Sequence, residues 1–217
     1  VRDGQHPSVA SISCSDSRLP TEGLWRARSA RGWFTGSIDT LDPPYISVGQ
    51  YFQLAANVFS GLTKLGPDLQ IEGDLAEDWS VADGGATFTF TLRDDVTFHN
   101  GAEFSADDVE YTIRRTIEEE APAASKLSSL QPIDDGGVEV GGDYEVTIRW
   151  EQPNVTSLVY LTRGPGRAAT IVSQEAIEEM GADQYNVTPV GTGPFEVTGH
   201  EVGNSVTLDA YDDSFET

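Results

Sequence analysis

The residue of this chain best suited to covalent or metal chemistry is its one cysteine, Cys14. A single thiol excludes an internal disulfide and a metal site made of several thiolates. The thiol could carry a lipid, but Ser11-Ile12-Ser13-Cys14 follows Gly4-Gln5-His6-Pro7, whereas a lipoprotein signal has an apolar run there. We therefore identify no lipobox, and a buried or free thiol is the simpler interpretation.

Other short motifs also have a chemical interpretation. Asp94-Asp95 and Glu118-Glu119-Glu120 could bind a metal or act as acid and base, but uninterrupted acidic runs are typical of solvated surfaces. Gly191-Thr192-Gly193-Pro194 lacks the lysine and following helix of a phosphate-binding loop, which favours a tight turn. Asn154-Val155-Thr156 and Asn186-Val187-Thr188 fit N-glycosylation acceptors, which matter only if the chain is exported. No nucleophile, base and orienting group stand together, so we predict a protein that is not an enzyme and needs no cofactor.

The charge of the chain limits its partners. The 36 Asp and Glu residues against 13 Lys and Arg give a net charge of −23, which argues against nucleic acid because phosphate binding needs a positive field. Dense surface carboxylates keep a protein hydrated in molar salt, so the pattern predicts a halophilic protein. An acidic protein from ordinary salt is the alternative.

The pattern of apolar residues predicts the elements that would position these groups. Apolar residues at helical spacing indicate a helix over 54–62, and Ser105-Ala106-Asp107-Asp108 is typical of a helix start, here continuing to about residue 119. A short helix is expected over 155–161 and another from Ser173. Alternation predicts hairpins and strands, namely 77–81 with 86–92, 138–140 with 144–150, and two further strands over 193–197 and 205–208. The mixture predicts an α/β (mixed α+β) fold.

The first segment differs in composition from the rest. Residues 1–31 carry five Arg against Asp3, Asp16 and Glu22, and they are too poor in apolar residues to form a core alone. We expect a junction over 33–40, with poor order before it.

The stretch that ends in Cys14-Ser15-Asp16-Ser17-Arg18 resembles the first zinc-ligand motif of β-class carbonic anhydrases. The resemblance implies zinc binding by Cys14, with Asp16 and Arg18 as a dyad that tunes the open position of the metal. That family completes its site with a later His-x-x-Cys, and this sequence has no second cysteine. One thiolate without clustered histidines holds zinc weakly, so we interpret residues 1–33 as a vestigial carbonic-anhydrase-like remnant with no working metal site.

The rest of the chain, about residues 36–217, resembles the family 5 extracellular solute-binding proteins, the dipeptide, oligopeptide and nickel receptors of ABC importers. An ordered series of blocks is far more specific than any one of them. The blocks are Thr40-Leu41-Asp42-Pro43, Val58-Phe59-Ser60-Gly61-Leu62, Leu75-Ala76-Glu77-Asp78-Trp79, 87–93, Phe98-His99-Asn100-Gly101, Ser105-Ala106-Asp107-Asp108-Val109 and Gly191-Thr192-Gly193-Pro194.

This resemblance implies a two-lobed, periplasmic-binding-protein-like fold of class II. Residues 34–217 would be its N-terminal part, namely the first lobe with an extra subdomain inserted over about 52–161, and the second lobe would be missing. The implied function is extracytoplasmic capture of di- or oligopeptides at the cell surface. A monomer would deliver them to the permease subunits of an ABC importer. Nickel or another solute is the alternative ligand, and the first twenty residues show no signal-peptide h-region.

The resemblance also assigns ligand contacts. Peptide receptors of this family hold the ligand backbone along a strand, and the stretch after the Leu-Asp-Pro block supplies part of it. Backbone groups of Ser47, Val48 and Gly49 are therefore the expected contacts. Tyr45 could stack on a ligand or simply pack beside the prolines.

Charged residues near this stretch have two interpretations each. Asp42 precedes two prolines that fix the direction of the chain, which favours a structural role over a ligand contact. Arg163 and Arg167 could meet an anionic ligand group, or they could pair with the many carboxylates.

Three functions therefore compete. The ordered blocks support a peptide-binding module. Cys14, Asp16 and Arg18 support a zinc-dependent carbonic anhydrase, which would need a His-x-x-Cys from the adjoining reading frame. The third alternative is a truncated fusion in which neither part works.

Overall fold

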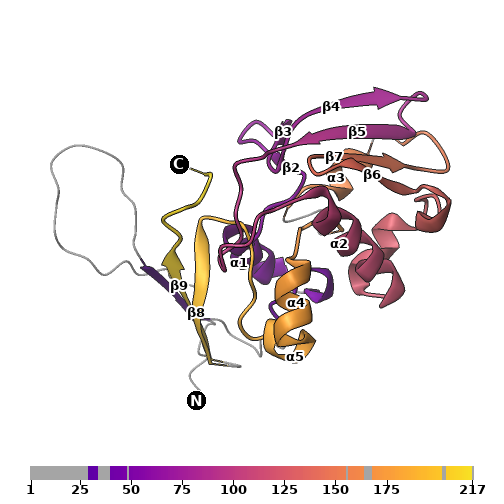
Figure 1. Cartoon of the computed structure of the whole chain (residues 1–217). Helices are drawn as coiled ribbons and strands as arrows, with labels where there is room; N and C mark the ends of the chain where they lie inside the picture. Colours follow the sequence, from indigo (N-terminus) through magenta and orange to yellow (C-terminus); the bar gives the residue numbers. More distant parts are fainter. Residues whose placement is uncertain are drawn as a thin grey trace, which may run out of the picture.

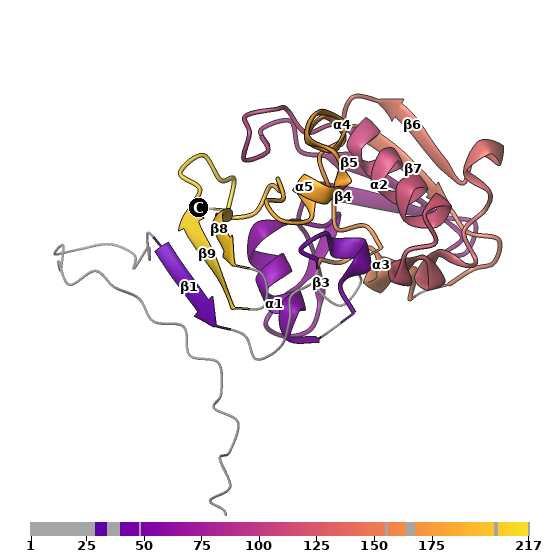
Figure 2. The same cartoon turned by 90° about the horizontal axis from the view of Figure 1, so that it is seen from below.

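The computed structural model describes residues 29–33, 40–47, 49–154, 156–163, 168–201 and 204–216. Cys14, Asp16 and Arg18 lie outside these ranges. A four-stranded sheet and a three-stranded sheet lie towards opposite ends of the described part of the molecule (Figures 1 and 2). The helices α1 (Gly49–Val58), α4 (Gln174–Met180) and α5 (Ala182–Tyr185) lie between these two sheets. No helix in the described ranges is long and apolar enough to cross a membrane.

An antiparallel four-stranded sheet forms one end of the molecule. Its strands run in the order β4 (Ala76–Ala82), β5 (Thr87–Leu92), β7 (Glu145–Arg149) and β6 (Val138–Gly142). Side chains alternate between faces along a strand, so Phe88, Phe90 and Leu92 are all buried, whereas Thr89 and Thr147 pair with each other through their hydroxyls at 3.0 Å. The α2 helix (Ala106–Glu118) lies against β6 and β7. Both predicted hairpins are confirmed.

Local capping signals start the helices where they were predicted. The Asp108 carboxylate accepts a hydrogen bond from the Ser105 backbone N–H at 3.1 Å at the start of α2. The Ser173 hydroxyl accepts one from the Ala176 N–H at 3.2 Å at the start of α4. Asp108 also accepts from the Gln174 N–H at 3.2 Å, so one carboxylate joins the starts of two helices.

The helix predicted over 54–62 is displaced, because α1 begins at Gly49 and ends at Val58. The residues after Val58 bond to other segments and so leave the helix. The Ser60 carbonyl accepts from the Ile171 N–H at 2.9 Å, and the Gly61 carbonyl accepts from the Leu75 N–H at 3.0 Å. The Cβ of a side chain at Gly61 would lie 2.5 Å from the backbone nitrogen of Arg163, so this close approach of two backbone segments requires glycine.

A second antiparallel sheet joins the two ends of the described chain. Its order is β1 (Ser29–Trp33), β9 (Ser205–Ala210) and β8 (Phe195–Glu201), and β8 and β9 confirm the two predicted C-terminal strands. The sheet crosses the boundary expected between residues 33 and 34, since β1 lies on its N-terminal side. The remaining elements are η1 (Pro43–Tyr45), β2 (Thr63–Leu65), β3 (Ile71–Gly73), η2 (Pro122–Leu127), η3 (Ile133–Asp135) and the predicted short helix α3 (Ser157–Tyr160).

Candidate ligand-binding segment

The segment expected to bind the ligand backbone lies between η1 and α1. Ser47 is exposed and has no regular secondary structure, Val48 lies outside the described residues, and Gly49 is the first residue of α1. The expected strand is therefore wrong at Gly49. The reason is that Tyr51, Leu54, Ala55 and Val58 recur at helical spacing and are buried, which stabilises a helix that starts earlier. Whether this segment contacts a ligand stays a prediction.

A buried ion pair holds the chain at Asp42, five residues before Ser47. Arg115 Nη2 on α2 lies 2.7 Å from Asp42 Oδ2, and the two side chains are 6% and 1% exposed. Burial raises the pKa of the Asp42 carboxyl, and this effect outweighs the lowering caused by the hydrogen bond and charge of Arg115. Asp42 Oδ1 and Arg115 Nη1 have no hydrogen-bond partner among the described residues. The structure thus supports the structural role preferred for Asp42, whose partner Arg115 lies 73 residues further along the chain.

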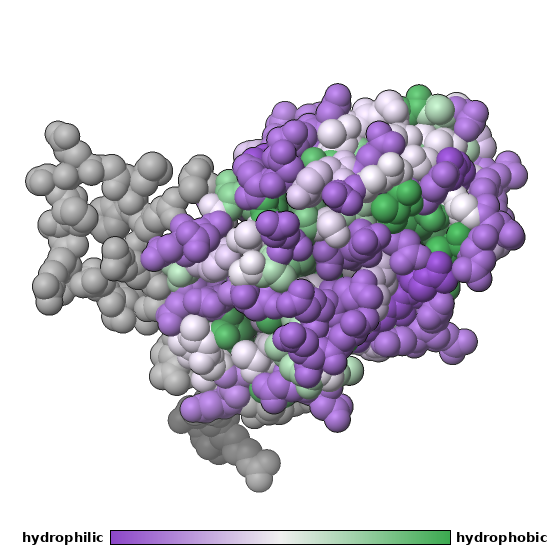
Figure 3. Space-filling view, in the orientation of Figure 1, coloured by the Kyte–Doolittle hydropathy of each residue, from purple (hydrophilic) through white to green (hydrophobic). Residues whose placement is uncertain are grey.

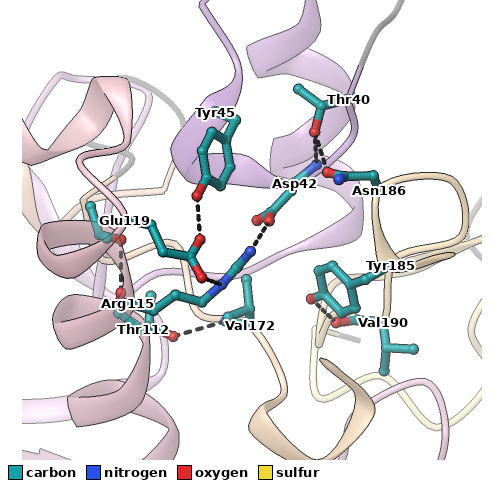
Figure 4. A network of polar contacts seen from close by, with 11 residues as sticks. Thr40, Asp42, Tyr45, Thr112, Arg115, Glu119, Val172, Tyr185, Asn186 and Val190 are labelled. Atoms are coloured by element: carbon teal, nitrogen blue, oxygen red, sulfur yellow. Dashed lines mark hydrogen bonds and ion pairs between the residues drawn. The ribbon is translucent and has the colours of Figure 1, made fainter. Parts of the chain in front are cut away.

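Tyr45 takes part in the same network (Figure 4). Its hydroxyl donates a hydrogen bond to Glu119, and its ring lies 5.7 Å from the Arg115 guanidinium carbon. Burial and the adjacent Glu119 carboxylate raise the pKa of Tyr45 to about 12, so the phenol is a neutral donor. These contacts account for Tyr45 by packing and pairing, and its stacking on a ligand stays a prediction.

Further hydrogen bonds fix the chain just before Asp42 and the segment packed beside α2. The Thr40 hydroxyl donates to Asn186 Oδ1 at 2.6 Å and accepts from the Asp42 N–H at 3.0 Å. The Leu41 N–H donates to the Asn186 carbonyl at 3.1 Å. On the other side of the ion pair, the Val172 N–H donates to the Thr112 hydroxyl of α2 at 3.2 Å. Residues 40–45 are therefore held by α2 and by the end of α5 before the chain reaches Ser47 (Figure 4).

His99 holds the turn at Gly191-Thr192-Gly193-Pro194. Its Nδ1 accepts from the Gly191 N–H at 3.2 Å, so its Nε2 carries the proton and donates to the Gly193 carbonyl at 3.0 Å. A side chain at Gly191 would lie 2.1 Å from the Val58 carbonyl oxygen. Burial lowers the pKa of His99, which favours the neutral ring that this geometry requires. The glycines thus form a tight turn against the end of α1, as predicted. The strand β8 follows this turn, whereas a helix follows a phosphate-binding loop.

Arg163 pairs with carboxylates of the chain. Its Nε lies 3.4 Å from Asp74 Oδ2, and its Nη2 donates to Glu216 at 2.9 Å. Asp74 is fully buried and also accepts from the Gly61 N–H at 2.9 Å. The second interpretation of Arg163 is therefore confirmed, whereas Arg167 lies outside the described residues.

A hollow of about 490 Å³ lies between the 98–108 region and α4. Much of its lining is acidic: Glu103, Asp107, Asp108, Glu175, Glu178 and Glu179. Hydrophilic side chains cover most of the face seen in Figure 3. In the ranges that the structure describes, no group of three or more His, Cys, Asp or Glu side chains is arranged to hold a metal ion. The carboxylates around the hollow would repel an anionic ligand.

Arg115 and Glu119 are the residues that the sequence analysis missed. Glu119 was assigned to a solvated acidic run, and its side chain is 45% exposed, but it also pairs with Arg115 at 3.2 Å. The spacing of four residues on one helix is a signal for such a pair. Nothing local, however, indicates that Arg115 reaches Asp42.

The sequence is similar to those of known proteins. Residues 70–215 match the model for bacterial extracellular solute-binding proteins, family 5 middle. A probable ABC transporter periplasmic-binding protein, SapA, of Escherichia coli is 29% identical over 199 residues, covering 82% of this chain and 36% of the relative. The dipeptide-binding protein DppE of Bacillus subtilis is 27% identical over 187 residues, covering 80% and 34%. The chain thus spans about a third of the length of these relatives.

Solved structures show the same fold. The binding protein MoaA of A. tumefaciens R10, in complex with mannopinic acid, is 28% identical with a TM-score of 0.74, covering 83% of this chain and 36% of that one. The substrate-binding domain of an oligopeptide ABC transporter from Bacillus anthracis has a TM-score of 0.76 at 21% identity, covering 84% and 38%. The predicted fold class, a mixed α/β part of a periplasmic-binding-protein fold, is confirmed. No comparison supports the carbonic anhydrase alternative.

Proposed function

The chain belongs to the bacterial extracellular solute-binding proteins of family 5, and on that basis we propose that it captures a di- or oligopeptide for an ABC importer. The match over residues 70–215 carries this proposal, because proteins of this family bind solutes for transport and are not enzymes. Relatives named for peptide transport support the choice of peptide. A permease in the membrane would be the partner, and capture would take place outside the membrane.

We further propose that residues 34–217 contribute one lobe, with about 52–161 as an inserted subdomain. The four-stranded sheet and α2 lie within 52–161, whereas β8 and β9 lie after it. Under this division the Asp42–Arg115 ion pair joins the lobe to its insertion. The pair would hold residues 43–47 in place for the ligand.

A single lobe should bind peptide weakly. Receptors of this design enclose the ligand between two lobes, and one lobe leaves the peptide backbone half solvated. Each backbone hydrogen bond then contributes a net of only about 1 kcal/mol against the several kcal/mol that association costs. We therefore expect dissociation constants in the millimolar range or weaker for this chain.

Titration calorimetry against a pool of di- to pentapeptides tests the proposal. The comparison is with a version extended to the length of the relatives, which should bind at micromolar concentration. Micromolar binding by the present chain would contradict the two-lobe reasoning. If the extended protein binds no peptide, the peptide proposal is wrong, and nickel complexes or mannopinic acid should then be titrated, since a related structure holds mannopinic acid.

A matched pair of substitutions tests the segment itself. Gly49 is the first residue of α1, where the backbone N–H has no partner within the helix and proline is tolerated. Gly49→Pro removes that N–H, and Gly49→Ala retains it. If this amide binds the ligand backbone, Gly49→Pro in the extended protein weakens peptide binding roughly 3- to 10-fold relative to Gly49→Ala. Equal affinities at equal stability would remove Gly49 from the site.

A further inference from the structure

The two Asn-x-Thr sequences of the chain occupy different structural settings. Asn154 lies in the loop between β7 and α3; it is partly exposed, and Pro153 and Thr156 beside it are exposed. Asn186 ends α5 and packs against residues 40 and 41. Because N-glycosylation needs an accessible asparagine amide and a nearby hydroxyl, the two sites can be compared by their contacts.

The Asn154 side chain forms two hydrogen bonds with Thr156, the threonine of its own Asn-x-Thr sequence. Its Oδ1 accepts a hydrogen bond from the Thr156 hydroxyl at 2.6 Å and another from the Thr156 N–H at 3.0 Å. Both donors stabilise negative charge on this oxygen, which is where charge develops when Nδ2 loses a proton. In the described part of the chain, no group accepts a hydrogen bond from Asn154 Nδ2, so the nitrogen is available to react.

Backbone hydrogen bonds around Asn154 hold this arrangement. The Asn154 N–H donates to the Gly85 carbonyl at 3.2 Å, and its carbonyl accepts from the Ser157 N–H at 3.0 Å. Gly85 belongs to the turn between β4 and β5, at the end of the four-stranded sheet (Figure 1). A side chain added at Gly85 would meet only the Asn154 backbone nitrogen, at 4.0 Å, so the turn is not tightly packed against the loop.

Asn186 is partly buried like Asn154, and no described group accepts a hydrogen bond from its Nδ2 either, but its side-chain oxygen is bonded to a distant residue. Its Oδ1 accepts from Thr40, its N–H donates to the Ala182 carbonyl at 2.9 Å, and its carbonyl accepts from Leu41. The Thr188 hydroxyl accepts from Gln184 Nε2 at 3.1 Å and makes no described contact with Asn186. This asparagine joins the end of α5 to residues 40 and 41.

We propose that the folded protein is N-glycosylated at Asn154 and not at Asn186. A base of the transferase removes one Nδ2 proton, and the nitrogen forms a bond to the anomeric carbon of a sugar carried on a lipid phosphate. The bond from that carbon to the phosphate oxygen breaks, and the lipid phosphate leaves with the electron pair. In the cell this modification rests on the proposed function, because it requires an exported chain.

The test uses the purified folded chain, an oligosaccharyltransferase that accepts Asn-x-Thr, and its lipid-linked oligosaccharide. Peptides of residues 150–160 and 182–192 serve as controls that the enzyme accepts both sequences. Intact mass and peptide mapping should show one glycan per folded chain, on Asn154. Asn154→Gln and Thr156→Val should each abolish the mass increase at unchanged circular dichroism.

Two results would overturn the proposal. One is an unmodified Asn154 in the folded chain when the peptide of residues 150–160 is glycosylated. The other is modification of Asn186 in the folded chain to the same extent as Asn154. The assay involves neither export nor ligand binding, so its failure is separate from a failure of peptide binding in calorimetry.

Discussion

Removal of the Arg115 guanidinium should destabilise the protein more than any loss of a surface ion pair. Arg115→Met retains an aliphatic chain but leaves the Asp42 carboxylate, 1% exposed, without its cation. Breaking a buried pair by removal of one partner costs about 3–5 kcal/mol. The contact between Arg115 and the half-exposed Glu119 adds at most about 1 kcal/mol. For a chain of this size, the loss corresponds to a melting temperature roughly 6–20 °C lower.

The charge of Asp42, rather than lost packing, should account for most of this effect. Asp42→Asn retains a hydrogen-bond acceptor for Arg115, whose cation keeps Glu119 as a counter-charge, so its cost should be smaller, about 1–2 kcal/mol. The double variant Arg115→Met/Asp42→Asn should therefore be more stable at pH 7 than Arg115→Met alone. A double variant no more stable than the single one would refute the reasoning.

The pH dependence gives an independent check. A carboxyl group whose pKa is raised on folding adds stability that is fully present below its unfolded pKa and is lost as pH rises through the folded pKa. Burial already raises the pKa of Asp42, and loss of Arg115 should raise it further. The deficit of Arg115→Met should therefore shrink as pH falls from 7 to 5.

Urea denaturation followed by tryptophan fluorescence, at constant molar KCl, measures these differences. Arg114→Met is the matched control, because Arg114 is the adjacent residue of α2. Among the described residues it pairs with Glu110, Glu118 and Asp134, whose side chains are 25%, 64% and 88% exposed, so none of these carboxylates is buried as Asp42 is. Its loss should cost less than about 1 kcal/mol. Equal effects of the two substitutions would mean that the burial of the Asp42 pair contributes nothing.

Four further predictions follow from features elsewhere in the molecule. Gly191→Ala should destabilise by about 1–3 kcal/mol or more, because the new methyl would lie 2.1 Å from a backbone oxygen; Gly142→Ala, with nothing within 4 Å, is the control, and equal melting temperatures would contradict the clash. Burial raises the pKa of Asp74 to about 6, so wild type should gain stability over Asp74→Asn as pH falls from 7 to 4.5; a pH-independent difference in urea titrations would disprove this. The melting temperature measured by circular dichroism should rise when KCl is raised from below about 0.1 M to molar concentration, because salt screens the repulsion between carboxylates. An unchanged melting temperature would exclude the halophilic interpretation. Metal analysis should find no stoichiometric zinc at Cys14 and assays no hydration of carbon dioxide, whereas one tightly held zinc per chain would show that the vestigial interpretation is wrong.

Local signals predicted most of the secondary structure. Ser105 and Asp108 lie three residues apart and make the contact that starts α2, so a short window of sequence contains the whole cause. The same holds for Phe88, Phe90 and Leu92, whose alternation determines which face of β5 is buried. The helix over 54–62 was misplaced because the bonds of Ser60 to Ile171 and Gly61 to Leu75 come from distant segments.

The candidate site was harder to predict because its contacts are distant in sequence. Asp42 was assigned a structural role from its prolines, yet its partner Arg115 could be found only once α2 was packed against residues 40–45. The strand expected at Ser47–Gly49 came from family resemblance, and the helical spacing of Tyr51, Leu54 and Val58 could have shown that a helix begins at Gly49.

The pairing of β1 with β9 has a consequence for the order of events in the cell. Ser29 pairs with Asp209, so the sheet cannot close until the ribosome has added about 180 residues after its first strand. At the usual 5–20 residues per second, this takes roughly 10–35 s. The four-stranded sheet closes earlier, because its last strand ends at Arg149. The nascent chain therefore carries a completed middle part and an unpaired first strand for several seconds. During that interval a chaperone or export factor would find residues 29–33 without their partner strand.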